Sequence, residues 1–130
     1  MQKTFDNLTV TRETNGKLPR LPFLHMKNAI LGKDYELSLV FVGRAQAVAL
    51  HKEWKGKPDP VNILSFPLAK NEGEILISLE KARRECRNFD RSYENYLAFL
   101  FIHGCVHLKG FDHGSKMEAE EKKYRAQFGV

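Results

Sequence analysis

Three of the five histidines lie within eleven residues, in the segment HGCVHLKGFDH (103–113). His103 and His107 are four residues apart, so a helix would place both imidazoles on one face, one turn apart. Gly110 is expected to end that helix, after which the chain can turn back and bring His113 to the same face. Three neutral imidazoles with a fourth position open to water form the ligand set of a catalytic zinc site. The spacing therefore predicts one Zn²⁺ on these three histidines, with Ni²⁺ also possible because it too suits imidazole.

A purely structural role suits this segment less well, and its neighbours are weaker candidates for ligands. A single histidine on an apolar face is usually a hydrogen-bonded core residue, but three at this spacing are not easily explained that way. Cys105 is two residues from each helical histidine and would point away from them, so we do not expect a fourth ligand there. Asp112 suits two roles about equally, holding a histidine N–H or capping its own turn. His25 and His51 are isolated, and we assign them no metal role.

The residue after the first histidine decides against one class of enzyme. In zinc peptidases with the HExxH motif, that position is a glutamate that acts as the general base. Here it is Gly104. Peptide hydrolysis by that mechanism is therefore disfavoured, although the ligand half of the motif is present.

Length and composition predict one globular domain over residues 1–130, because 42% of the residues are apolar. The most apolar run, from Tyr96 to Ile102, is far shorter than the roughly 20 residues of a membrane span. Cys86 and Cys105 form no CxxC motif, so we expect both to be buried, reduced thiols. No apolar signal segment follows Met1, so we expect a cytoplasmic protein without a membrane partner. The net charge of +5 suits an anionic partner such as RNA.

The elements that must position the histidines can be read from apolar periodicity and turn residues. Alternating or continuous apolar residues predict strands at 35–43, 61–68 and 72–78, and a possible edge strand at 4–11. Pro67 indicates a sheet edge or a bulge. Helices are expected at 22–31 with Gly32 as its cap, 44–55, 79–89 after the capping residue Ser78, 92–109 and 115–127, with a turn at 56–60. The helix at 92–109 is apolar almost all round, which is typical of a helix in the middle of a domain.

The helix at 79–89 has two distinct sides. One side is a predicted apolar stripe of Leu79, Ala82, Cys86 and Phe89. Another side is basic, with Lys81, Arg84 and Arg91, and with Arg83 and Arg87 nearby. The basic side is either an ordinary solvated face or a surface that contacts RNA.

Three segments of the sequence together resemble a known family. HGCVHLKGFDH is similar to HGxLHLxGYDH, the signature of the YbeY family of bacterial zinc endoribonucleases that act in ribosomal RNA maturation. VNILSFPL resembles the family's TNVLSFPF, and GEILIS resembles its GDIVIS. The likeness covers about residues 35–120, with the segments in the same order.

The resemblance implies an α+β fold, in which helices pack on a small mixed sheet and a central buried helix carries two metal ligands in a zincin-like arrangement. It implies zinc on His103, His107 and His113. It also implies cleavage of single-stranded RNA rather than DNA, in maturation of the 3′ end of the small-subunit ribosomal RNA and in ribosome quality control. The ribosome would then be a partner, while the oligomeric state is left open.

One segment departs from the family pattern. The family reads LNxxYRxKDxPTN where this chain has LHKEWKGKPDPVN, so Lys55 replaces an arginine whose charge is functionally important in the family. Lysine keeps the charge but loses the bidentate fork that grips a phosphate. We expect Lys55 and His107 to be catalytic, with Lys55 stabilising negative charge on the phosphate and Lys57 as its alternate. Both lysines could instead be ordinary loop residues that serve solubility.

Two further residues are candidates for RNA contact. Ser65 is expected to touch RNA on the resemblance alone, and Arg84 is expected to do so from the basic side of its helix. Two other function classes stay open, namely a non-catalytic zinc-containing ribosome or RNA-binding factor and a metallohydrolase of another substrate.

Overall fold

The computed structural model describes residues 1–55 and 62–130, without the side chains of residues 50, 51, 54 and 55. Five strands form one sheet in the order β1-β2-β3-β5-β4. The strands are β1 (Gln2–Phe5), β2 (Leu8–Arg12), β3 (Glu36–Val42), β4 (Ile63–Ala69) and β5 (Glu72–Ser78). The helices are α1 (Phe23–Leu31), α2 (Arg44–Lys55), α3 (Leu79–Glu85) with the 3-10 turn η1 (Cys86–Phe89), α4 (Tyr93–Leu108) and α5 (Ser115–Phe128). The predicted turn at 56–60 lies outside the described residues.

The sheet is mixed, as the sequence predicts. Strands β2, β3 and β5 are parallel neighbours, while β1 and β4 are antiparallel edge strands. The register of β4 against β5 shifts between Pro67 and Ala69. Proline has no N–H to donate, so an irregular edge position tolerates it. The prediction of an edge or a bulge at Pro67 is therefore confirmed.

The prediction of a single edge strand over residues 4–11 is wrong. The chain reverses there, and β1 and β2 pair as a hairpin with Phe5 opposite Leu8. Asp6 takes a positive φ of 41° in the turn, a conformation that a short polar side chain tolerates. The turn lacks the glycine that usually marks a two-residue hairpin, so its residues do not indicate a reversal.

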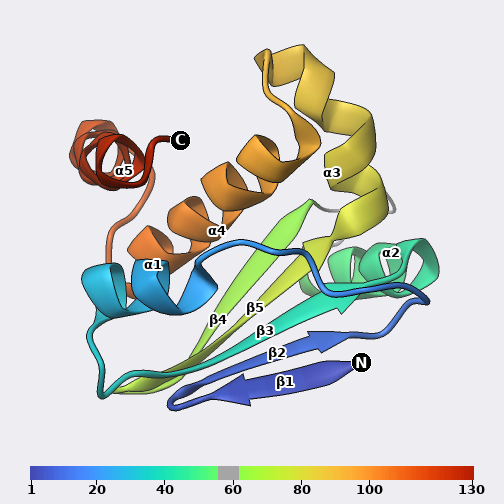
Figure 1. The fold of residues 1–130 in the computed structure, drawn as a ribbon, viewed down its shortest axis with the longest axis horizontal. Coiled ribbons are helices and arrows are strands. Elements are labelled where there is room, and N and C mark those ends of the chain that lie inside the picture. The colour runs from blue at the N-terminus through green and yellow to red at the C-terminus, as the bar shows by residue number, and fades with distance from the viewer. Residues whose placement is uncertain (56–61) are drawn as a thin grey trace.

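Helix α4 lies at the centre of the fold. It crosses one face of the sheet, with α1 and α5 beside it (Figure 1). Leu97, Phe101 and Ile102 are fully buried, which confirms the prediction of a central buried helix. A second, smaller cluster, which includes Ala47 of α2 and Leu76 of β5, lies on the other face of the sheet.

The predicted helix boundaries hold at their capping residues. The Ser78 hydroxyl accepts the N–H of Lys81 at 3.2 Å, and the Ser92 hydroxyl accepts that of Asn95 at 3.1 Å. Gly110, with a φ of 112°, follows the end of α4. These local contacts fix where α4 begins and ends, and hence where its histidines lie.

The predicted stripe on the helix at 79–89 is partly wrong. Leu79, Ala82 and Cys86 are buried, but 51% of Phe89 is exposed. The α-helix ends at Glu85 and continues as a 3-10 turn, which has three residues per turn and so shifts Phe89 off the buried side. Both cysteines are buried and free, as predicted.

No helix in residues 1–55 and 62–130 is both long and apolar enough to cross a membrane.

Candidate metal centre

The last turns of α4 carry His103 and His107 on a side that the core leaves partly open. Both histidines are partly exposed, whereas Gly104, Cys105 and Val106 between them are buried. The loop after Gly110 brings the exposed His113 back to the same side. The ring centroid of His113 lies 5.5 Å from that of His103 and 6.1 Å from that of His107. The three predicted ligand residues are thus neighbours in space.

The three imidazoles border a hollow of about 320 Å³ against strand β4. We call it the histidine hollow. Its other lining residues are Ile63, Leu64, Ser65 and Phe66. Ser65, predicted to contact RNA, therefore lies beside the three histidines.

Three imidazoles are a ligand set that suits a transition metal, but the three rings lie farther apart than ligands of one ion. No three His, Cys, Asp or Glu side chains of the described ranges stand close enough together to hold one ion. At a Zn–N distance of about 2.1 Å and tetrahedral angles, two imidazole centroids on one ion are about 5 Å apart. The measured 5.5 and 6.1 Å exceed that spacing only slightly. Imidazole favours Zn²⁺ or Ni²⁺ over Mg²⁺ or Ca²⁺.

One imidazole nitrogen at the site is unused. His107 Nδ1 is buried and has no hydrogen-bond partner among the described residues. A buried polar atom normally has a partner, because leaving it without one costs free energy. His107 therefore has a nitrogen free for a ligand, a water molecule or an ion.

A carboxylate on α5 orients His103. Glu121 Oε1 lies 2.9 Å from His103 Nδ1, and only 5% of Glu121 is exposed. Arg125 Nη1 is 3.9 Å from the same oxygen. An ionised carboxylate only accepts hydrogen bonds, so His103 donates its Nδ1–H and keeps the lone pair on Nε2 for another partner.

The sequence suggested Asp112 for this role and missed Glu121. Asp112 is exposed, and it is Glu121 that contacts a histidine. A signal was present, because Glu121 stands between Met117 and Tyr124 at spacings of four and three residues. All three are buried on one face of α5. A carboxylate within an apolar helical stripe needs a polar partner.

The close approach of α4 to β4 explains why a glycine follows His103. A Cβ atom on Gly104 would lie 2.9 Å from Ile63 Cδ1, 3.0 Å from Ile75 Cδ1 and 3.0 Å from Ser65 Oγ. A glutamate at this position, as in an HExxH peptidase, would require at least Ile63 to shift. The same close approach brings Ser65 to the histidine hollow.

Cys105 is unsuited to be a ligand. Its side chain is fully buried, and burial raises the pKa of the thiol. The ligand form of cysteine is the thiolate, which this environment disfavours. The expectation that Cys105 points away from the metal site agrees with this burial.

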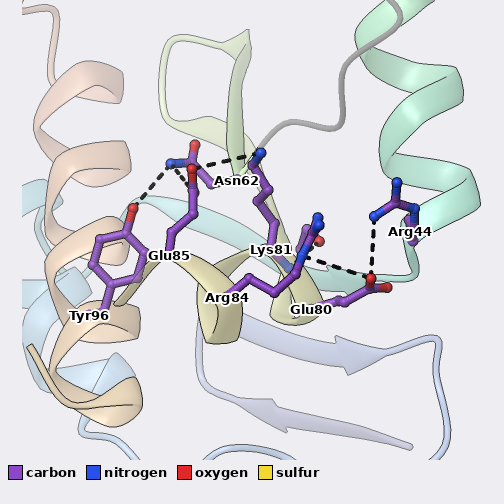
Figure 2. A network of polar contacts seen from close by, with 8 residues as sticks. Arg44, Asn62, Glu80, Lys81, Arg84, Glu85 and Tyr96 are labelled. Atoms are coloured by element: carbon purple, nitrogen blue, oxygen red, sulfur yellow. Dashed lines mark hydrogen bonds and ion pairs between the residues drawn. The ribbon is translucent and has the colours of Figure 1, made fainter. Parts of the chain in front are cut away.

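Of the cationic side chains predicted to contact RNA or its phosphate, the structure describes only that of Arg84. Lys55 is the last residue of α2, but its side chain and all of Lys57 lie outside the described residues. Arg84 pairs with Glu80 at 4.0 Å, and Glu80 also pairs with Arg44 at 3.4 Å (Figure 2). Arg84 does not line the histidine hollow. Its surroundings are those of a solvated helix face.

Residues 9–128 match the family model described as Endoribonuclease YbeY. The chain belongs to the YbeY family. This confirms the resemblance found in the sequence. The match to the family model covers the sheet from β2 onwards and the whole histidine segment, so all three histidines lie within the shared domain.

Individual relatives agree with this assignment. A protein of Rhizobium etli named Endoribonuclease YbeY is 36% identical over 109 residues, which cover 73% of this chain and 64% of that protein. A protein of the same name from Alkaliphilus metalliredigens is 33% identical over 105 residues, which cover 72% of this chain and 68% of that protein. The chain therefore spans about two thirds of the length of these curated relatives.

A solved structure shares the fold. The solution structure of a Thermotoga maritima protein superposes with a TM-score of 0.64, covering 90% of this chain and 85% of that one. The two sequences are 24% identical. This similarity supports the mixed sheet and the arrangement of helices.

Proposed function

We propose that this chain is a metal-dependent endoribonuclease that cleaves single-stranded RNA. One observation carries the proposal: three imidazoles line one hollow in a member of the YbeY family. The relatives described above are named endoribonucleases. The net charge of +5 suits a polyanionic substrate.

In this proposal His103, His107 and His113 hold one divalent ion, Zn²⁺ or Ni²⁺. When bound, such an ion supplies Lewis acidity at the scissile phosphate and makes water a competent nucleophile near neutral pH. Glu121 fixes the ring of His103 so that Nε2 faces away from the carboxylate. Ser65 offers a hydroxyl at the wall of the histidine hollow that can donate to a phosphate oxygen.

A cation beside the phosphate would complete the site. Negative charge grows on the phosphate during hydrolysis, and a fixed positive charge stabilises it. Lys55 is our candidate for that cation, with Lys57 as the alternate, on the basis of the family's arginine at the corresponding position. We further propose that the substrate is ribosomal RNA, at the 3′ end of the small-subunit molecule, that the ribosome is a partner, and that the protein acts in the cytoplasm.

Cleavage of matched single- and double-stranded RNA, before and after chelation, tests the activity. We expect the purified protein to cut only the single strand, to lose activity after chelation and to regain it with Zn²⁺ or Ni²⁺. His103→Ala should be inactive, whereas His25→Ala, which changes an exposed histidine on α1, should keep full activity. A folded, metal-loaded protein that cuts no RNA, or a fully active His103→Ala, would contradict the proposal.

A further inference from the structure

Phe89 is unusual among the aromatic residues because half of its surface is exposed beside an ordered stack of rings. Its centroid lies 5.1 Å from that of Tyr96, with 20° between the ring planes. Tyr96 stacks in turn on Phe99, at 5.8 Å and 13°. We call Phe89, Tyr96 and Phe99 the aromatic platform. Single exposed apolar residues are common on protein surfaces, so the exposure of Phe89 alone indicates no ligand. What points to a ligand is that Phe89 lines one hollow together with His103 and His113.

A second hollow, of about 330 Å³, lies over the aromatic platform. We call it the aromatic hollow. The three platform residues line it together with Ile63, His103 and His113, and these last three also line the histidine hollow. The two hollows therefore meet at His103 and His113.

The platform is held in place by polar contacts. Asn62 Nδ2 lies 3.3 Å from the Tyr96 hydroxyl and 3.3 Å from Glu85 Oε1. Figure 2 shows Asn62 bridging Tyr96 and Glu85. The Arg91 guanidinium lies 4.5 Å from the centroid of Phe99. Phe89 itself has ring contacts to two of these residues, with its centroid 5.1 Å from that of Tyr96 and 6.2 Å from that of Phe99.

The charges in the two hollows select different parts of a nucleotide. The charged side chains that line the aromatic hollow, apart from its histidines, are Glu118 and Glu121. No lysine or arginine of the described residues lines it. Both carboxylates already have a partner, because Arg125 Nη2 lies 2.9 Å from Glu118 Oε1 and His103 Nδ1 lies 2.9 Å from Glu121 Oε1. Their other oxygens disfavour a phosphate but can accept N–H groups at the edge of a nucleobase. Among the described residues, the histidine hollow has no carboxylate in its lining, so it is the better place for the phosphate.

We propose that the aromatic hollow binds one nucleobase of single-stranded RNA, next to the phosphate held at the histidines, with the base stacked on Phe89. This inference rests on the proposed function, since it places the substrate of that activity. Stacking on an aromatic side chain tolerates any base, because every base has a π-face. A base inside a duplex is already stacked on its neighbours, so this site accounts for selection of single strands.

Binding of a short RNA tests the base site without cleavage. The affinity of the metal-loaded protein for a fluorescein-labelled decauridylate analogue that resists hydrolysis is measured by fluorescence anisotropy. Loss of one stacked base weakens binding about 5- to 150-fold, so we expect Phe89→Ala to raise Kd within this range and Phe89→Trp to restore the wild-type value. The matched control is Phe5→Ala, which removes the 42% exposed phenylalanine of β1 and should leave Kd unchanged. No measurable binding by the wild type, equal Kd for Phe89→Ala, or equal losses in both alanine variants would overturn the proposal.

Cleavage kinetics and abasic substrates separate this inference from the proposed function. With the metal-loaded protein, Phe89→Ala should raise KM and leave kcat within about twofold, because the ring contacts substrate but no reacting atom. An abasic nucleotide at the stacked position should weaken RNA binding by the wild type and should not change RNA binding by Phe89→Ala. Binding that depends on Phe89 without cleavage of any RNA would refute the nuclease and retain the base site. Cleavage with wild-type KM in Phe89→Ala would refute the base site and retain the nuclease.

Discussion

The two ends of helix α4 share one apolar sequence but meet different surroundings. In the first part, Leu97 and Phe101 are fully buried, and the ring centroid of Phe101 lies 5.0 Å from that of Phe23 in α1. In the last turns, His103 and His107 are partly exposed beside the edge strand β4. The two parts belong to one α-helix, so the difference arises from the elements that pack against them.

This difference shows how a buried helix can carry polar chemistry. An imidazole in the first part of α4 would be sealed among apolar side chains and would cost free energy. At the other end, Glu121 provides a partner for His103, and the hollow leaves His107 accessible to a ligand. Packing in the core therefore fixes where the histidines lie. Their place beside the edge strand β4 leaves them accessible to a ligand.

The largest effect on stability is expected in the buried part of α4. Phe101→Ala removes a fully buried ring and should lower the free energy of unfolding by about 3–5 kcal/mol. Denaturant unfolding of the metal-free protein measures this loss. Metal affinity of the molecules that remain folded should be unchanged, so a stable Phe101→Ala protein that no longer binds zinc would contradict the division between the two ends of α4.

A smaller effect is expected at Gly104, which lies between the two histidines in the last turns of α4. Helix propensity alone predicts that Gly104→Ala stabilises the protein by about 1 kcal/mol. Three neighbours at 2.9–3.0 Å crowd the new Cβ, and overpacking of this kind costs about 1–3 kcal/mol. We expect a net loss of stability, measured by thermal and denaturant unfolding. A gain would show that β4 moves away easily and that Gly104 is not needed for the close approach.

The third effect concerns metal affinity rather than stability, and it is expected at the carboxylate that orients His103. Glu121→Gln replaces a charged acceptor with a neutral amide and should weaken zinc binding by about tenfold, because partners of metal ligands contribute this much. Competition with a chromogenic chelator measures the affinity. Glu120→Gln is the matched control, since Glu120 pairs with Lys109 rather than with a histidine, and its zinc affinity should stay at the wild-type value. Equal affinities in all three proteins would remove Glu121 from the site.

The sequence predicted the parts of the fold that depend on local order. Strands β3, β4 and β5 and the starts of α3 and α4 follow from apolar runs and from the caps Ser78 and Ser92, which act within a few residues. The hairpin of β1 and β2 was missed because its turn uses Asp6 at positive φ instead of glycine. Such a turn depends on pairing between strands as much as on the turn residues.

The candidate site was predictable to the extent that it lies on one segment. The histidines converge because helical spacing and one turn bring them together, and both are local properties. Glu121 is 18 residues from His103 and meets it only because α5 packs on α4, so no spacing rule connects them. The exposure of Phe89 depends on the change from an α-helix to a 3-10 turn, which the apolar stripe does not reveal.

Elemental analysis of the purified protein by mass spectrometry, with His107→Ala and His25→Ala prepared alongside, tests the central claim most directly. The account predicts one zinc or nickel ion per chain in the wild type and in His25→Ala, and none in folded His107→Ala. One ion per chain in all three proteins, with unchanged affinity, would contradict it.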